Sequence, residues 1–133
     1  MDNQTIKNIE VGKFYIIHDG SDGGHPGLVI WKDDLNNLYL LIKFGTTQND
    51  KNTPIEHPLS KNVSKHYVYK RAVLAKRKDV GREWMFDYEI NDEDKSIVEN
   101  VTIEQPVFSK SINRKDKRFY SLAIKLGKIK TAI

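Results

Sequence analysis

The segments Gly27-Leu28-Val29-Ile30-Trp31 and Leu38-Tyr39-Leu40-Leu41-Ile42-Lys43-Phe44 decide the fold of this chain. Both are strand-length runs of aliphatic, β-branched and aromatic residues, and 38–44 carries the strongest strand signal in the chain. The residues between them, Asp33-Asp34-Leu35-Asn36-Asn37, are typical of a turn, because Asn and Asp tolerate left-handed backbone. A connection this short predicts that the two strands pair antiparallel.

Further strands are predicted on both sides of this hairpin. They cover residues 13–18, 54–59, 66–75, 83–90 and 119–126. Pro54 and Pro58 place the second of these segments at a sheet edge or in a loop. One helix is predicted to begin at Asn91, because Asn is a good N-cap and the three acidic residues after it favour a first helical turn. The sequence therefore predicts one mainly-β domain over 1–133, organised as a small barrel.

Composition limits the classes to which the protein can belong. A chain of 133 residues has the usual size of one domain. It contains no cysteine, which excludes disulfides and thiolate metal sites. No apolar run reaches the roughly 20 residues of a membrane span, and the polar start does not read as a signal peptide. We therefore expect a cytoplasmic protein with no membrane partner.

The net charge of +4 is unevenly distributed along the sequence. Residues 61–82 and 106–133 each carry eight positive charges and one negative charge, whereas 83–105 carries one positive and eight negative. One interpretation is that these blocks neutralise each other across the surface. The other is that the two basic blocks share a face and bind a polyanion such as RNA.

Most motifs of catalysis and cofactor binding are missing. The glycine-rich segment 20–27 is followed by no Gly-Lys-Ser/Thr and leads into a strand, so it is neither a Walker loop nor a dinucleotide fingerprint. There is no Gly-x-Ser-x-Gly elbow, and the four histidines form no metal-ligand motif with carboxylates. The sequence predicts neither a metal nor a cofactor.

The order of elements between residues 11 and 80 resembles the MazF/PemK toxins. The resemblance rests on a strand start at Gly12, a glycine-rich loop leading into His25-Pro26-Gly27-Leu28-Val29-Ile30, a strand ending in Gly45-Thr46-Thr47-Gln48, and the segment from Pro54 to Ser60. These toxins are sequence-selective endoribonucleases of bacterial toxin–antitoxin systems, with an SH3-like barrel and a homodimeric assembly. The resemblance implies an SH3-like, MazF/PemK-like barrel core over 11–80 and a divergent C-terminal part of the same domain over 81–133. It also implies single-stranded RNA as substrate, a cognate antitoxin of protein or RNA, and a homodimer.

Two positions carry the catalytic part of this resemblance. The family has a catalytic arginine immediately before the proline, where this chain has His25. Thr46 matches the threonine that opens the family's Thr-Thr-Gln element, its second key residue. An acidic residue that some members use in a later strand has only the basic stretch Tyr69-Lys70-Arg71 as its counterpart. Either the chemistry is rebuilt around histidine, with His25 and Thr46 catalytic, or the fold is kept without the activity.

The chemistry of RNA cleavage can be matched to residues directly. Cleavage without metal needs a base for the 2′-hydroxyl, donors or cations for the phosphorane oxygens and an acid for the leaving 5′-oxygen. Histidine, with an unperturbed pKa of about 6.5, suits either proton-transfer role. Cations and aromatic rings after the second strand suit phosphates and splayed bases. The predicted RNA-binding residues are Tyr67, Tyr69, Lys70, Arg71, Lys76 and Arg77, with Trp84 as a further stacking ring.

Each of these residues also has a structural interpretation. A histidine between glycine and proline can be a surface turn residue, and Thr46 can simply end a strand. Tyrosine and tryptophan in alternating strands are commonly core residues, and 76–78 can be a solvated turn. Two further functions therefore stay open. One is a non-catalytic basic β-domain, of the kind encoded by phages or mobile elements, that binds nucleic acid or inhibits a nucleic-acid-processing enzyme. The other is a protein-interaction domain that uses the acidic block 83–105.

Overall fold

The central hairpin predicted from the sequence is the middle of the sheet. In the computed structural model, residues 8–18, 25–46, 52–56, 66–84 and 90–131 are described. Strand β3 (Leu38–Gly45) is buried along its whole length. It pairs antiparallel with β2 (His25–Asp33) on one side and with β5 (Tyr67–Lys76) on the other. The turn between β2 and β3 places Asn37 at φ 55°, the left-handed backbone that Asn tolerates. The antiparallel hairpin is confirmed.

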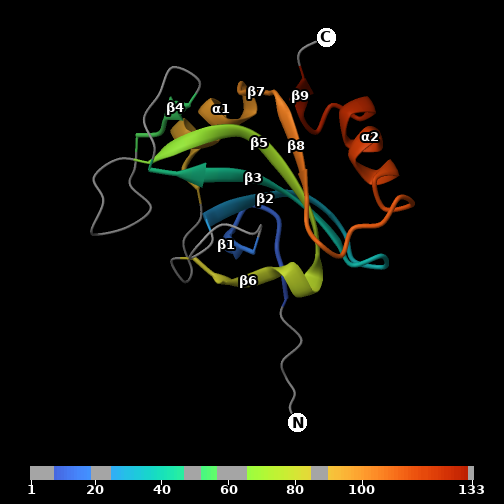
Figure 1. Cartoon of the computed structure of the whole chain (residues 1–133). Helices are drawn as coiled ribbons and strands as arrows, with labels where there is room; N and C mark the ends of the chain where they lie inside the picture. Colours follow the sequence, from blue (N-terminus) through green and yellow to red (C-terminus); the bar gives the residue numbers. More distant parts are fainter. Residues whose placement is uncertain (1–7, 19–24, 47–51, 57–65, 85–89, 132–133) are drawn as a thin grey trace.

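Short strands extend the sheet at both sides (Figure 1). The order is β4-β5-β3-β2-β1-β6, and β8 pairs with β5 outside this path. The added strands are β1 (Phe14–Ile17), β4 (Thr53–Pro54), β6 (Val80–Glu83) and β8 (Gln105–Phe108). β8 runs parallel to β5, whereas the other pairings of this sheet are antiparallel.

The mainly-β fold class is confirmed, but barrel closure is not. No pairing among the described strands joins β6 to β4, β5 or β8, so the described sheet is open and the SH3-like barrel stays a prediction. The segment that contains Pro54 lies at an edge, as predicted, because among the described strands β4 pairs only with β5. Of the strand predicted over 83–90, Glu83 belongs to β6, and 85–89 lies outside the described residues.

The α-helices of the described part of the chain lie in its C-terminal third. These are α1 (Asp92–Glu99) and α2 (Arg118–Lys125), with a 3-10 turn η1 (Arg77–Asp79) earlier in the chain and a small parallel pair, β7 (Thr102–Ile103) and β9 (Lys130–Thr131). The helix predicted after Asn91 is confirmed, since the Asn91 side chain accepts a hydrogen bond from the Asp94 amide at 3.1 Å. No described helix is long and apolar enough to cross a membrane.

The strand predicted over 119–126 is wrong, because this segment is the helix α2. The alternation of Leu122, Ile124 and Leu126 indicated a strand, but all three side chains are at least 40% exposed. The residues that α2 buries are Phe119, Tyr120 and Ala123. Their spacing follows a helical face, so the buried pattern and the apolar pattern differ here.

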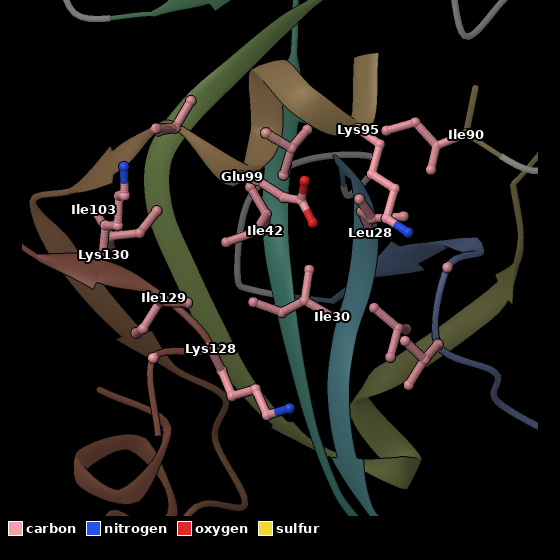
Figure 2. Close-up of a pocket in the computed structure, with 16 residues that line it drawn as sticks. Leu28, Ile30, Ile42, Ile90, Lys95, Glu99, Ile103, Lys128, Ile129 and Lys130 are labelled. Atoms are coloured by element: carbon pink, nitrogen blue, oxygen red, sulfur yellow. The ribbon is translucent and has the colours of Figure 1, made fainter. Parts of the chain in front are cut away.

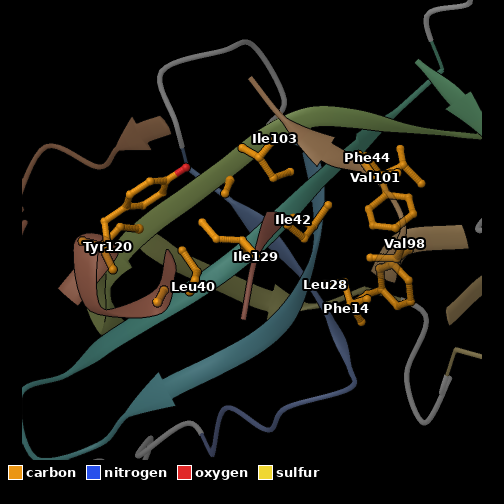
Figure 3. Packing of buried hydrophobic residues seen from close by; sticks show 14 of the residues in the cluster. Phe14, Leu28, Leu40, Ile42, Phe44, Val98, Val101, Ile103, Tyr120 and Ile129 are labelled. Atoms are coloured by element: carbon orange, nitrogen blue, oxygen red, sulfur yellow. The ribbon is translucent and has the colours of Figure 1, made fainter. Parts of the chain in front are cut away.

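Two hydrophobic clusters lie on opposite faces of the sheet. The larger cluster packs the sheet against α1, α2 and the C-terminal segment, and Figure 3 shows part of it. In it Phe14 meets Phe44 edge-on at 5.1 Å between ring centroids, and Trp31 stacks on Phe119 at 4.0 Å. The smaller cluster covers the other face with Ile9 and residues of β1 and β6. Since the larger cluster joins residues of 11–80 and 81–133, these two parts share one core.

A buried carboxylate fastens α1 to the edge of the sheet. Asp94 has no exposed surface. One of its carboxylate oxygens accepts a hydrogen bond from the Glu56 amide at 2.6 Å, just after β4. The other lies 3.5 Å from the side-chain nitrogen of Asn91, the N-cap residue. Asp94 therefore satisfies backbone and side-chain donors of two segments that are far apart in the sequence.

Candidate functional site

His25 and Tyr69 meet at one end of the sheet although β3 lies between their strands. His25 is the first residue of β2 and is half-buried. Its ring centroid lies 6.1 Å from that of Tyr69 in β5, with the ring planes tilted by 57°. The sequence placed His25 on a flexible loop, but its backbone pairs with Ile17 of β1. The imidazole is therefore held by regular structure.

Gly45 allows the rings of His25 and Tyr69 to come together. A Cβ atom at Gly45 would overlap the hydroxyl and ring of Tyr69, so the tyrosine lies across β3 where that strand has no side chain. Gly27 has a similar role beside β1, since a Cβ atom there would overlap the side chain of Ile17. Both glycines thus allow a neighbouring side chain to lie close to the backbone.

Lys43 is a site residue that the sequence analysis missed. It pairs with Gly27 in the register of β2 and β3. Successive side chains of a strand point to opposite faces of the sheet. Lys43 is therefore expected on the same face as His25 and Gly45, two positions away along each strand. It is only 6% exposed, which is unusual for a lysine. The sequence feature that could have identified Lys43 is its position as the single lysine inside β3, which is otherwise apolar.

Thr46 lies at the same end of the sheet as His25. It follows Gly45 directly, and its side chain is exposed at the end of β3. Gly45 pairs with Tyr67 of β5, so Thr46 also lies near the start of that strand. Thr47, Gln48 and the glycines at 23 and 24 lie outside the described residues.

The predicted RNA-binding cations fall into two separate groups. Lys70 and Arg71 directly follow Tyr69. Arg71 is exposed, and the Lys70 ammonium lies 3.8 Å from the Glu104 carboxylate. Lys76 and Arg77 lie seven and eight residues beyond Tyr69, which corresponds to roughly 23 Å or more along an extended strand. They do not converge with His25.

Lys76 and Arg77 instead fasten the far end of the sheet. The Lys76 ammonium lies 3.3 Å from the Asp116 carboxylate and donates to the Asn36 carbonyl at 3.0 Å. The Arg77 guanidinium donates to the Tyr39 hydroxyl at 2.9 Å and lies 4.0 Å from Asp34. The hydrogen bond from Lys32, together with that from Tyr39, holds the pKa of the Asp34 carboxyl below its usual value. These cations therefore have structural partners in the β2–β3 turn and before α2.

The predicted stacking rings are largely covered by protein. Tyr67 and Tyr69 are each 8% exposed, and Trp84 is half-buried against the larger cluster. Their exposure agrees with the core interpretation of these rings. Within the described residues there is also no group of three or more His, Cys, Asp or Glu side chains placed to hold a metal ion.

His66 gives the fold a defined response to acid. It is 3% exposed, and burial lowers the pKa of its imidazole. The unfolded chain therefore takes up a proton near pH 6.5 that the folded chain binds only at lower pH. We expect the free energy of unfolding to fall as the pH drops below about 6.5, and His66→Leu to reduce that slope. Urea unfolding of both proteins between pH 8 and pH 5 measures it, and parallel curves would contradict the prediction.

The site thus consists of a histidine, a tyrosine and a lysine on one face at one sheet end, with a threonine hydroxyl and an arginine beside them. These residues are His25, Tyr69, Lys43, Thr46 and Arg71. Comparisons of the chain with protein-family models, with curated proteins and with solved structures find no match.

Proposed function

We propose that this chain is a metal-independent endoribonuclease toxin of a toxin–antitoxin system that cleaves single-stranded RNA. The observation that supports it best is the contact of His25 with Tyr69 over Gly45, the residue that Thr46 follows in the chain. A histidine, two residues with hydroxyl groups and a buried lysine then lie at one end of the sheet, and groups of these kinds suit proton transfer and phosphate stabilisation in phosphodiester cleavage.

The proposed reaction is attack of the RNA 2′-oxygen on the adjacent phosphorus. His25 accepts the 2′-hydroxyl proton while the bond from phosphorus to the 5′-oxygen breaks. The leaving oxygen takes a proton from a second donor, for which the Tyr69 hydroxyl is a candidate because its ring lies beside that of His25. The products are a 2′,3′-cyclic phosphate and a 5′-hydroxyl, so no external water or redox partner is consumed.

The phosphate contacts in this proposal come from the near group of cations. Arg71 is exposed two residues after Tyr69, and Lys43 lies on the face of His25. Lys70 has no part in these contacts, because it alternates with Tyr69 along β5 and so lies on the other face, with its ammonium 3.8 Å from the Glu104 carboxylate. Lys76 and Arg77 contribute to stability instead, because each already has a carboxylate partner at the far end of β5.

The rest of the proposal follows the resemblance of residues 11–80. It comprises an SH3-like arrangement of the strands, a homodimer, a cytoplasmic location and a cognate antitoxin that blocks the strand end of His25.

The test is to incubate the purified, antitoxin-free chain with end-labelled single-stranded RNA in EDTA. We expect slow cleavage that leaves cyclic phosphate ends. If the RNA stays intact but is bound, with an affinity that falls steeply as the salt concentration rises, the result would favour the non-catalytic binding domain over the nuclease. Intact RNA and no binding would favour the protein-interaction domain. That function would be identified by a protein partner that is captured by the original chain and lost when exposed acidic residues of 83–105 are neutralised.

A further inference from the structure

A second site lies on the helix-bearing face of the sheet. It is a cavity of about 500 Å³ between β2, β3, α1 and the segment 127–130 (Figure 2). This volume falls within the range of small-molecule pockets. The walls are mostly aliphatic and include Leu28, Ile30, Ile42, Val98, Ile103 and Ile129.

The charged residues of this cavity carry a positive excess. Lys95 and Glu99 come from α1, and Lys128 and Lys130 from the C-terminal segment (Figure 2). All four side chains belong to exposed residues. The cavity therefore combines an apolar interior with three ammonium groups against one carboxylate.

These lysines form no strong ion pairs within the described part of the protein. Lys130 donates to the Asn100 side chain at 3.4 Å, a long hydrogen bond to a neutral group. Lys95 precedes Glu99 by four residues on α1, and this order gives the weaker helical ion pair. Among the described residues, no salt bridge joins Lys95 or Lys128 to a carboxylate.

This cavity is separate from the strand end of His25. Leu28 and Ile42 belong to the cluster on the helix-bearing face, whereas Gly27 and Lys43 precede and follow them on the alternate face. A ligand in the cavity therefore does not contact the imidazole, and the two sites can be tested independently.

We propose that the cavity binds a small amphipathic carboxylate. The aliphatic tail lies against Ile30 and Ile42, and the carboxylate lies at the rim, where the exposed Lys95, Lys128 and Lys130 stand on different sides of the opening (Figure 2). An uncharged aliphatic molecule would make only the apolar contacts. A polyanion such as RNA would interact with the lysines but has no aliphatic part to pack against Ile30 and Ile42. The charge at the rim and the apolar interior together select this ligand class.

The probe is sodium octanoate, titrated into the full chain with isoleucine methyl groups labelled for NMR. We expect saturable shifts at Ile30, Ile42 and Ile129 with a Kd of about 1 mM, and markedly weaker binding of octanol. The double variant Lys95→Gln/Lys128→Gln should raise the octanoate Kd about 5–10-fold. Lys110→Gln removes one exposed lysine that does not line the cavity, and should leave the Kd unchanged.

A filled cavity provides the second arm of the test. Ile30 is only half-buried, so Ile30→Trp is expected to fold and to occupy the site, which should abolish the shifts at Ile42 and Ile129. Absence of saturable shifts in the original chain would overturn the proposal. So would octanoate binding that survives both Ile30→Trp and the double lysine variant. His25→Ala should bind octanoate normally, whatever its effect on RNA.

Discussion

Replacing His25 with alanine is expected to slow RNA cleavage by about 10²–10⁴-fold, the usual contribution of a positioned acid or base. The imidazole is the one group of the site whose unperturbed pKa lies near neutrality. His25→Gln should lose a similar factor, since an amide donates and accepts hydrogen bonds but does not carry the proton. Single-turnover cleavage of labelled RNA measures both rates.

Two matched variants separate chemistry from folding. Tyr69→Phe removes only the hydroxyl over Gly45 and should cost less activity than His25→Ala, while retaining the ring contact. Lys76→Gln acts at the far end of β5 and should leave the cleavage rate of folded protein unchanged. Full activity in His25→Ala with an unchanged circular dichroism spectrum would move the chemistry away from this strand end.

Asp94→Ala is expected to lower the free energy of unfolding by about 2–4 kcal/mol, since it removes a buried charged acceptor and leaves donors unsatisfied. The Glu56 amide loses its 2.6 Å partner, and the side chain of the N-cap Asn91 loses a neighbour. The change also removes a link between α1 and β4. Urea unfolding at pH 7 measures the loss.

The control for this prediction is in the same turn of the helix. Asp92 is exposed and begins α1, so Asp92→Ala should cost only about 0.5 kcal/mol through its interaction with the helix dipole. Equal losses for the two variants would mean that α1 depends on its acidic first turn in general and that the Asp94 contact with Glu56 has no special weight.

The central sheet could be predicted from sequence because its signals are local. Apolar runs of strand length flank a turn whose Asn37 adopts the left-handed backbone, and the Asn91 cap marks the start of α1. The helix in the segment 119–126 could not be predicted this way, because the exposed leucines and isoleucine of this segment imitate strand alternation. The parallel pairing of β8 with β5 depends on contacts between distant segments and leaves no local pattern.

The candidate site was predicted in part. His25 and Thr46 were predicted through the resemblance of residues 11–80, and both lie at one end of the sheet. The position of Tyr69 across Gly45 depends on three adjacent strands, so no single segment indicates it. The separation of Lys76 from His25 follows from strand length, since one extended strand cannot bring both of its ends to one site.

The placement of β4 and β8 decides how copies of this protein can associate through backbone hydrogen bonds. Both short strands lie along the outer side of β5, at Tyr67–Val68 and at Arg71–Leu74, and so occupy most of its exposed amide and carbonyl groups. Among the described strands of this sheet, β4 and β8 then form one edge, and the other edge is β6, which has β1 as its single neighbour. It is four residues long and ends in Arg82 and Glu83, charges that disfavour open-ended stacking of one sheet on another. The fold thus protects its long strands from edge-to-edge aggregation while they carry an apolar core.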